Sequence, residues 1–279
     1  MSKFIKTNYD LNDKEIVSVI DELSLWAAPF GLKLLETIKL KKNIKALDIG
    51  FGLGFPLLEL AMRLGDSCKV YGIDPWEAAT ERAKFKAKIY DLNNVEFLSG
   101  IAENIPLADK SIELIFSNNG INNVEDLEKT FKECSRILKP GGQFVFSFNL
   151  NGTMIEFYNA FRETLLEHSM HKEIENIEKH IYAKRKPIDE VKNLVEENNF
   201  IVNDIKEDEF CYRFNDGTSM MNHFLIRFAF LESWKDLIPE KNQNEIFNEI
   251  EDKLNKFSES NGELKLTIPF AVFNCEKLT

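Results

Sequence analysis

The segment LDIGFGLGFP carries the residues whose types and spacing point most directly to ligand chemistry. Its three glycines, Gly50, Gly52 and Gly54, can adopt positive φ and bring no side chain between a ligand and the backbone. Asp48 lies two residues before the first glycine, and Asp74 follows 20 residues after the last. A carboxylate at that interval can accept both hydroxyls of a ribose. The spacing therefore predicts a nucleoside-binding site.

The order of the glycines distinguishes between two classes of nucleotide ligand. A dinucleotide fingerprint, G-x-G-x-x-G, requires glycine at position 55, where this chain has Phe55. The pattern is instead D-x-G-x-G-x-G. Asp48 is unfavourable beside a pyrophosphate and favourable beside the ammonium of an amino acid. The site therefore favours a nucleoside joined to an amino acid, and S-adenosylmethionine is such a ligand.

The elements that must position these residues alternate regularly between short apolar runs and amphipathic segments. The runs are rich in Ile, Val, Leu and Phe, as expected for strands buried on both faces of a parallel sheet. They are KALDIG (45–50), KVYGID (69–74), NVEFLSG (94–100), SIELIFS (111–117) and GQFVFSF (142–148). Helices are expected between them at 55–64, 76–90 and 124–138, the last ending at Lys139-Pro140-Gly141-Gly142. This alternation predicts an α/β, Rossmann-like fold with a mostly parallel sheet and helices on both faces.

The flanking segments complete the predicted sheet to seven strands and add a helical cap. Residues 13–40 predict two helices that meet at Ala28-Pro29, and 153–182 predict one long helix or two shorter ones. Further helices are expected at 187–198, 219–237 and 240–257, and further strands at 200–214 and 263–273. We expect N-terminal helices (1–43) that cover the site and a core (44–150). Residues 151–279 would complete the sheet and supply inserted cap helices over its carboxyl edge, all within a single compact unit.

Composition excludes several classes of function. The 279 residues carry 35 Lys and Arg against 46 Asp and Glu, a formal charge of −11, which disfavours binding to a nucleic-acid backbone. No apolar run reaches 18 residues, so no membrane span is expected, and MSKFIKTNYD lacks the apolar core of a signal peptide. Four scattered cysteines without a CxxC pair indicate reduced thiols. The chain is predicted to be a cytoplasmic monomer or homodimer.

Residues 44–148 resemble a class I S-adenosylmethionine-dependent methyltransferase. The resemblance is to the small-molecule branch that includes ubiquinone and menaquinone C-methyltransferases. It rests on four segments in the family's order and intervals: LDIGFGLG, VYGIDPW, SGIAENIPLADKSIELIFSNNGINNV and LKPGGQFVFSF. Each is weak alone, and the four together are specific.

The resemblance implies a set of cofactor contacts. The glycines would line the methionine part, with Asp48 at its amino group and Asp74 at the ribose hydroxyls. Ile101 stands where many members have an aspartate for the adenine amino group, and Glu103 could take its place. The residues so placed around the cofactor are Asp48, Gly50, Gly52, Gly54, Asp74, Pro75, Trp76, Ile101, Ala102, Glu103 and Asn118.

Acceptor contacts and catalytic groups are less defined by the sequence. The candidates for acceptor contact are Tyr9, Trp26, Asn119 and His223, and no residue is singled out as a general base. Turn formation is the equal alternative for the asparagines of SNNGINN, and a plain polar role is favoured for His223. Six aromatic residues line a pocket for an apolar acceptor or, as favoured by helical spacing, pack in the core: Phe157, Tyr158, Phe161, Phe224, Phe228 and Phe230.

No metal site is expected. His168 and His171 stand three apart and could share a helix face as ligands, but no third ligand is evident from the sequence. Exposed positions on a helix are the favoured interpretation.

The sequence thus predicts methyl transfer from S-adenosylmethionine to a small apolar metabolite by in-line displacement, with S-adenosylhomocysteine as product. A sulfonium is already activated, so the protein's task is alignment and exclusion of water. Two alternatives remain: a non-catalytic protein that binds or senses S-adenosylmethionine, and an NAD-dependent oxidoreductase, against which Phe55 counts.

Overall fold

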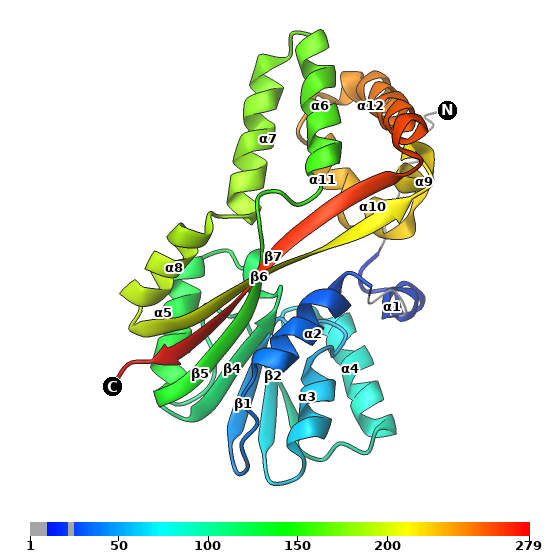
Figure 1. Ribbon diagram of the computed structural model, residues 1–279. Helices are drawn as coiled ribbons and strands as arrows, with labels where there is room; N and C mark the ends of the chain where they lie inside the picture. The colour runs from blue at the N-terminus through cyan, green and yellow to red at the C-terminus, as the bar shows by residue number, and fades with distance from the viewer. Residues whose placement is uncertain (1–9, 22–24) are drawn as a thin grey trace. The chain divides into compact units, whose positions relative to one another are not determined.

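The computed structural model describes residues 10–21 and 25–279 of the chain. They divide into two compact units (Figure 1). Unit 2 contains residues 10–149, 187–208 and 270–279, and unit 1 contains 150–186 and 209–269. The chain therefore passes from one unit to the other at 149/150, 186/187, 208/209 and 269/270.

The described residues form seven strands and twelve α-helices, with one short 3-10 helix. The strands are β1 (Lys45–Ile49), β2 (Lys69–Ile73), β3 (Val95–Leu98), β4 (Ile112–Asn118), β5 (Leu138–Asn149), β6 (Phe200–Phe214) and β7 (Leu264–Lys277). The helices are α1 (Lys14–Asp21), α2 (Ala27–Thr37), α3 (Leu57–Leu64), α4 (Glu77–Ile89), η1 (Ile121–Asn123), α5 (Leu127–Ile137), α6 (Ile155–Glu167), α7 (His171–Lys184), α8 (Ile188–Glu197), α9 (Gly217–Asn222), α10 (Phe224–Ala229), α11 (Leu231–Lys235) and α12 (Glu240–Asn261).

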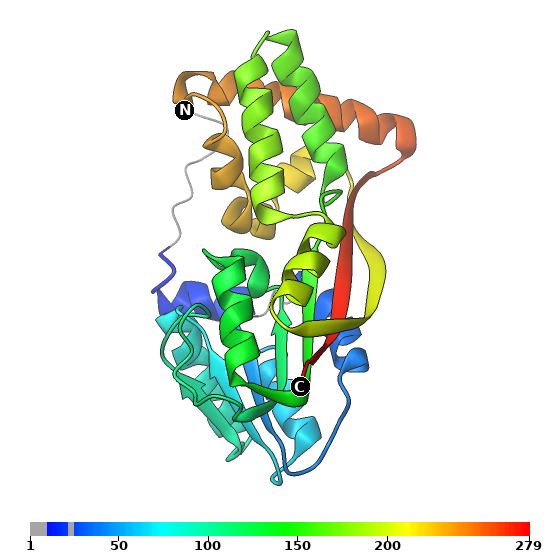
Figure 2. The ribbon, with the colours of Figure 1, turned by 90° about the vertical axis from the view of Figure 1, so that its left-hand side faces the viewer.

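The seven strands form one sheet in the order β3-β2-β1-β4-β5-β7-β6. The first five are parallel, and β7 runs antiparallel to β5. Helices α2, α3 and α4 cover one face of the sheet in unit 2, and α5 and α8 cover the other (Figures 1 and 2). The predicted Rossmann-like, mostly parallel, seven-stranded sheet with helices on both faces is confirmed.

The centre of the sheet in unit 2 is buried on both faces. In β1 only the first residue is exposed, and in β4 only Glu113 is not fully buried. The apolar runs without alternation follow from this environment, because both sides of each central strand face helices. Because the strands are parallel, the carboxyl ends of β1, β2 and β4 lie at the same edge of the sheet. Helices α3 and α4 begin at this edge, since each follows one of these strands in the chain.

Packing between β5 and β7 closes the sheet in unit 2. Seven residue pairs join them, from Gln143↔Glu276 to Asn149↔Phe270. The ring of Phe146 stacks on that of Phe273 with centroids 4.7 Å apart. Such a stacked pair adds to the stabilisation from burying two large rings.

Unit 1 consists of helices and the outer parts of the two long strands. Helices α6 and α7 run side by side (Figure 2), and α9–α12 lie between β6 and β7 in the chain. The predicted insertion of helices between two late strands is confirmed. The position of these helices as a cap over the carboxyl edge of the sheet stays a prediction.

One prediction about proline was wrong, and one about a helix end was confirmed in part. Pro29 does not mark a joint but lies in the first turn of α2, where a missing N–H leaves no helical hydrogen bond unmade. The helix predicted to stop at Lys139-Pro140-Gly141-Gly142 does end there to within one residue, but these four residues belong to β5. The helix ends at Ile137, and the strand begins at once with Leu138, which pairs with Ile112 before a shift in register.

One helical segment is divided as predicted, and another is more divided than expected. The segment 153–182 forms two helices, one of the two alternatives predicted. The expected helix 219–237 is three helices, because His223 is extended (φ −67°, ψ 133°) and Phe230 also leaves the helical region (φ −127°, ψ −40°). The strand predicted at 200–214 has those bounds in the structure.

Only one of the two predicted segment boundaries lies near a point where the chain passes between the units. The boundary between residues 43 and 44 falls inside unit 2, and the one between 150 and 151 lies one residue from a passage between the units. The organisation as a single compact unit stays a prediction. Among the described residues, no helix is long and apolar enough to cross a membrane.

Candidate functional site

The candidate site lies at the carboxyl ends of β1, β2 and β4 in unit 2. There the loop after β1 touches the loop after β4: a Cβ built on Gly50 would lie 2.6 Å from the Cα of Gly120. The Ser117 hydroxyl donates to the Ile49 carbonyl oxygen (2.7 Å) and accepts from the Ile121 N–H (3.2 Å). These contacts hold the two loops together, so the glycine segment begins from a fixed position.

Asp74 connects the end of β2 to the glycine segment. Its Oδ2 accepts from the Gly52 N–H and its Oδ1 from the Trp76 N–H, both at 2.8 Å. Burial raises the pKa of this carboxyl, and the two backbone N–H groups oppose that rise. An ionised carboxylate offers about four lone-pair sites, so each oxygen can accept one further hydrogen bond, as the two hydroxyls of a ribose would require.

Asp48 is a buried carboxyl with unused hydrogen-bonding capacity. It is fully buried in β1, and within the described part of the chain neither oxygen accepts a hydrogen bond of normal geometry, although the Leu57 backbone N–H lies close enough to lower its pKa. Burial, reinforced by the charge of Asp74, raises its pKa well above the usual range. A buried polar group without a partner is costly and calls for a functional explanation. A cation beside Asp48 would supply the missing partner.

The glycines of the segment differ in how much space lies next to their backbone. A Cβ on Gly52 (φ +51°) would meet nothing within 4 Å, so the space next to this backbone is open. A Cβ on Gly54 would lie 2.9 Å from Leu58 and 3.3 Å from Ala83, so glycine there allows close packing of α3 and α4. Gly52 is therefore the glycine whose environment best suits a ligand.

The residues after Asp74 have different exposures. Pro75 is exposed, and Trp76 is half-buried at the start of α4. The indole Nε1–H of Trp76 donates to the Leu11 carbonyl oxygen at 2.8 Å, which orients the ring through its polar edge. The predicted contact of these residues with adenine stays a prediction.

The segment after β3 presents three residues with different surroundings. Ile101 is 47% exposed, whereas Ala102 and Glu103 are buried. The Oε1 of Glu103 accepts from the backbone N–H groups of Glu125 (2.8 Å) and Asp126 (3.2 Å). Since this oxygen already holds the loop before α5, any contact of Glu103 with adenine would have to use the other one.

The asparagines after β4 are connected to α2 and β5. The Asn118 Nδ2 donates to the Ala27 carbonyl oxygen (3.0 Å), and its Oδ1 accepts from the Ser147 hydroxyl (3.2 Å). Asn119 has φ +60°, and its Oδ1 accepts from Asn122 (3.0 Å). The buried Nδ2 of Asn119 has no acceptor among the described residues. Turn geometry explains Asn119 in part, and its amide N–H₂ remains available to a ligand.

The other three residues predicted to contact the methyl acceptor are far apart in the sequence. Tyr9 is outside the described residues. The Trp26 ring meets Phe30 edge to face, with centroids 5.4 Å apart, next to the start of α2 in unit 2. His223 belongs to unit 1, where burial lowers its pKa. Its buried Nδ1 lacks a hydrogen-bond partner in the described chain.

Three of the six aromatic residues pack in the core, and Phe224, Phe228 and Phe230 are half-buried. Phe157, Tyr158 and Phe161 are fully buried on α6, and the ring of Phe157 stacks on Trp234 with centroids 3.7 Å apart. The favoured interpretation, packing in the core, is confirmed for these three residues.

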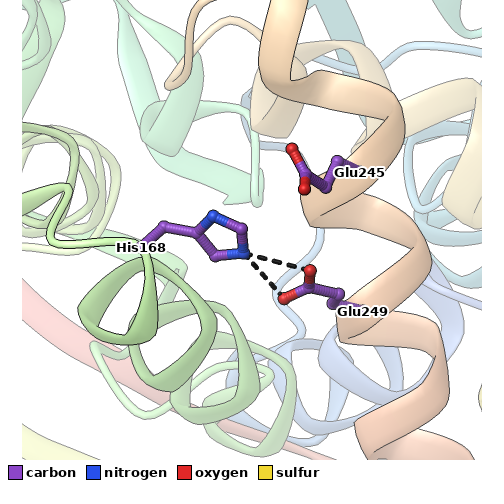
Figure 3. Close-up of side chains that lie close together, drawn as sticks. All are labelled: His168, Glu245 and Glu249. Atoms are coloured by element: carbon purple, nitrogen blue, oxygen red, sulfur yellow. Dashed lines mark hydrogen bonds and ion pairs between the residues drawn. The ribbon is translucent and has the colours of Figure 1, made fainter.

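His168 and His171 do not share a helix. His168 follows α6, and His171 begins α7. Figure 3 shows His168 facing Glu249, with Nε2 2.9 and 3.0 Å from the carboxylate oxygens, and Glu245 nearby. The Glu249 carboxylate raises the pKa of His168. The three side chains have suitable atoms within 4.8 Å of one another for a metal ion, but an ion pair already accounts for their arrangement.

Sequence reasoning missed the contact between α2 and the glycine segment. A Cβ on Gly31 would lie 2.2 Å from Cε1 of Phe55 and 3.1 Å from Nδ2 of Asn118. Gly31 thus allows α2 to pack directly against the loop that starts α3. Its glycine type was visible in the sequence, but its partner was not.

The fold is the one found in class I S-adenosylmethionine-dependent methyltransferases. In agreement, residues 47–146 match a family model described as "Methyltransferase domain". This part of the chain is therefore similar to a methyltransferase domain.

Curated relatives that match the chain are demethylmenaquinone methyltransferases. The chain is 31% identical over 127 residues to a demethylmenaquinone methyltransferase of Bacillus mycoides, covering 46% of this chain and 54% of the relative. It is 33% identical over 113 residues to the one of Staphylococcus saprophyticus, covering 40% and 48%. The match spans about half the length of these relatives.

Solved structures agree in fold at low sequence identity. A putative methyltransferase from Bacillus halodurans superposes with a TM-score of 0.60 at 17% identity, covering 89% of this chain and 99% of that one. Geranyl diphosphate C-methyltransferase from Streptomyces coelicolor gives 0.56 at 15% identity, covering 93% and 82%. These likenesses concern the fold.

Proposed function

We propose that this protein is a methyltransferase that moves a methyl group from S-adenosylmethionine to a small, apolar acceptor. The observation that carries the proposal is the buried, unpartnered carboxyl of Asp48. Asp48 lies near the end of β1, and Gly52, whose backbone has open space beside it, follows that strand. The Gly52 N–H donates a hydrogen bond to Asp74. A carboxylate for an ammonium, a space along the backbone and a second carboxylate for ribose hydroxyls are the features that this cofactor requires.

The residues of the site would hold the cofactor by separate contacts. Asp48 would pair with the methionine ammonium, Gly52 would admit the ligand against the backbone, and Asp74 would accept the ribose hydroxyls. Gly50 and Gly54 would keep the segment in place through their close contacts. Pro75, Trp76, Ile101, Ala102 and Glu103 would surround the adenine, and the backbone of Asn118 would face the methionine.

When bound, S-adenosylmethionine supplies an activated methyl group. The protein's own contribution is then alignment of the acceptor with the S–CH₃ bond and exclusion of water. Positive charge disappears from the sulfur in the transition state, so neutral donors and aromatic faces suit the acceptor side better than carboxylates. The amide of Asn119 is one such neutral group in unit 2. Tyr9, Trp26 and His223 stay predictions as acceptor contacts.

The acceptor class is supported by the named relatives and by composition. The curated relatives are demethylmenaquinone methyltransferases, and one solved neighbour is described in complex with geranyl diphosphate. Both names indicate acceptors with long apolar parts. The chain's 23 phenylalanines and formal charge of −11 also favour an apolar small molecule over a nucleic acid.

The proposal is tested by calorimetric titration of the purified protein with S-adenosylmethionine, S-adenosylhomocysteine and NAD in parallel. We expect micromolar binding of the first two and none of NAD. Incubation with labelled S-adenosylmethionine and demethylmenaquinone or geranyl diphosphate then tests transfer. Binding of NAD alone, or of no ligand, would contradict the proposal.

A pair of glycine variants tests whether the ligand binds along the glycine segment. A valine at Gly52 would occupy the open space beside the backbone, and we expect S-adenosylmethionine binding to be lost. Gly141→Val is the matched control, because Gly141 also has positive φ (+72°) and open space around it but lies in β5. If Gly52→Val retains binding, the ligand does not lie along the glycine segment.

The alternative functions lead to different results. A non-catalytic sensor would bind S-adenosylmethionine without forming S-adenosylhomocysteine with any acceptor, and an NAD-dependent oxidoreductase would bind NAD. The assignment as a cytoplasmic monomer or homodimer without nucleic-acid partners stays a prediction. Light scattering of the purified protein tests the oligomeric state.

A further inference from the structure

Buried polar atoms that make no hydrogen bond of normal geometry gather at one edge of the sheet in unit 2. In the described part of this unit, the residues with such a side-chain atom are Asp48, Asn94, Asn119, Asn122 and Asn149. All but Asn94 belong to the carboxyl end of β1 or β5 or to the turn after β4. Such atoms are costly to bury, so their common location calls for a common explanation. The proposed cofactor accounts for Asp48, and the three asparagines at this edge remain.

Asn119 and Asn122 form a pair of amides in which each has one unused group. The Asn122 Nδ2 donates to the Asn119 Oδ1 at 3.0 Å. The Asn119 Nδ2 and the Asn122 Oδ1 are buried and have no partner in the described chain. Turning both amides over would exchange these roles and again leave one N–H₂ group and one carbonyl oxygen unused. Asn119 is only 9% exposed, so water can supply little of what the pair lacks.

Asn149 adds a second unused oxygen on the neighbouring strand. Where β4 and β5 pair, Asn118 is level with Ser147, and the Ser147 hydroxyl accepts from the Asn119 N–H at 2.9 Å. Side chains alternate along a strand, so Asn149 lies on the same face of β5 as Ser147 and nearer to the carboxyl edge. Its buried Oδ1 has no partner among the described residues. The turn after β4 and the end of β5 therefore carry the same kind of unused amide group.

The chemistry of the missing partner follows from these unused atoms, which are a donor on Asn119 and acceptors on Asn122 and Asn149. An ionised carboxylate only accepts, so it would repel the two amide oxygens. An ammonium only donates, so it would leave the Asn119 N–H₂ unpaired. A neutral group that both donates and accepts, of which a hydroxyl is the smallest, suits both kinds of atom.

We propose that Asn119, Asn122 and Asn149, the asparagine site, bind a neutral hydrogen-bonding group of the methyl acceptor, such as a hydroxyl, and select the acceptor by it. The Asn119 N–H₂ donates to the oxygen of that group, and the oxygen of Asn122 or of Asn149 accepts its proton. The inference rests on the proposed function, because it identifies the ligand at this edge as the acceptor. Uncharged contacts of this kind also suit a transfer in which positive charge disappears.

Four probes of similar length with different head groups test the asparagine site: 1-octanol, heptyl methyl ether, octylammonium chloride and sodium octanoate. Each is titrated into the wild type with and without saturating S-adenosylhomocysteine. We expect 1-octanol to bind at least about ten-fold more tightly than either ion. It should bind at least about three-fold more tightly than the ether, which accepts hydrogen bonds but cannot donate one. An ether or an ion that binds as tightly as 1-octanol would overturn the proposal.

Asn119→Asp should change which head group is preferred. Aspartate has the same size and tolerates the φ of +60° at this position, but an oxygen replaces the N–H₂. We expect 1-octanol to bind about ten-fold more weakly than in the wild type and octylammonium about ten-fold more tightly. A merely structural role for Asn119 would lower the melting temperature and leave the preference as it was, and that result would contradict the proposal.

Asn93→Asp is the matched control for the added charge. Asn93 is exposed and precedes β3, so it lies at the opposite edge of the parallel sheet. All four affinities should match those of the wild type. Octylammonium binding that rises equally in Asn93→Asp and Asn119→Asp would mean that net charge, and not the asparagine site, determines the preference.

A second variant decides the matter if Asn119→Asp does not fold. The double variant Asn122→Leu/Asn149→Leu removes both acceptor oxygens without adding a charge. We expect it to bind 1-octanol no more tightly than the ether, since no amide oxygen is left to accept the hydroxyl proton. If the double variant still prefers 1-octanol, the asparagine site is overturned.

Titration of the same samples with S-adenosylmethionine separates this inference from the proposed function. S-adenosylmethionine binding without a preference for 1-octanol would overturn the asparagine site and leave the proposed function standing. A preference for 1-octanol that Asn119→Asp abolishes, in a protein that does not bind S-adenosylmethionine, would do the reverse. Binding of neither ligand would overturn both.

Discussion

Asp74 has two roles at the scale of single residues. It accepts the backbone N–H of Gly52 and that of Trp76, so it orders the glycine segment before any ligand arrives. It is also the predicted ribose contact. A residue that both shapes the loop and contacts the ligand should affect binding more than stability.

Asp74→Ala should therefore weaken S-adenosylmethionine binding about ten- to a hundred-fold, because two charge-assisted hydrogen bonds to ribose are lost. Calorimetry measures the affinity. Asp74→Asn, which retains one acceptor oxygen, should show a smaller loss. Unchanged affinity in Asp74→Ala would remove the ribose assignment.

Asp48 should make the stability of the ligand-free protein depend on pH. Burial raises its pKa in the folded state above the ordinary value of 3.8. A raised pKa means that the folded state binds the proton more tightly than the unfolded state. The stabilisation is therefore fully present below pH 3.8 and is lost as pH rises through the folded pKa.

Melting temperatures across that range, in the wild type and in Asp48→Asn, measure this effect. Asp48→Asn cannot ionise, so it should lack this part of the pH dependence and be the more stable protein at neutral pH. The same variant should bind S-adenosylmethionine more weakly, because the ammonium loses its carboxylate. A wild type and variant with the same pH profile would contradict a raised pKa.

At the scale of elements, the site depends on how α2 packs against the loop before α3. Gly31 lies against the Phe55 ring, where a Cβ would be 2.2 Å away. The site is thus built from the ends of β1, β2 and β4 together with a helix that precedes all of them in the chain. Changes on α2 should reach the glycine segment although α2 belongs to no motif.

Gly31→Ala should destabilise the protein by about 1–3 kcal/mol, as overpacking typically does. Urea denaturation measures the loss, and calorimetry should show weaker S-adenosylmethionine binding. The double variant Gly31→Ala/Phe55→Leu should recover part of the stability, because leucine is shorter than the ring. Full stability in Gly31→Ala alone would show that the ring moves at no cost.

At the scale of the whole molecule, neither unit is a continuous piece of chain. Residues 187–208 and 270–279 return to unit 2 after the helices of unit 1. The sheet that supports the site is completed only by β7, which pairs with β5 through seven residue pairs. The region of the methyltransferase match, 47–146, does not include that strand.

A fragment of residues 10–149 should therefore fail to fold. It leaves the edge of β5 unpaired and exposes Phe146, which stacks on Phe273 in the full chain. We expect aggregation or a melting curve without a cooperative transition, in contrast to the full chain. A soluble fragment with a sharp transition would show that β7 is dispensable for the sheet.

The sequence by itself determined the order and type of most elements and the place of the glycine segment after β1. Buried parallel strands produce nearly uninterrupted apolar runs, which is why β1 and β4 could be predicted from the sequence. Local signals were incomplete at Lys139-Pro140-Gly141-Gly142, which belongs to β5 although its pairing with β4 shifts register there, between Leu138 and Gln143. Of the side chains in Figure 3, Glu245 and Glu249 come from α12, and His168 follows α6, so the sequence alone did not bring the histidine to the two carboxylates.

Only the tertiary structure decided which distant residues meet. Phe55 reaches Gly31, and Arg185 reaches Tyr158. These contacts depend on how helices cross and pack. Side chains that meet in this way leave no period or spacing in the sequence, whereas a strand, a helix or a glycine turn must be encoded in neighbouring residues. The cofactor motif was therefore predictable, and the residues that shape its surroundings were not.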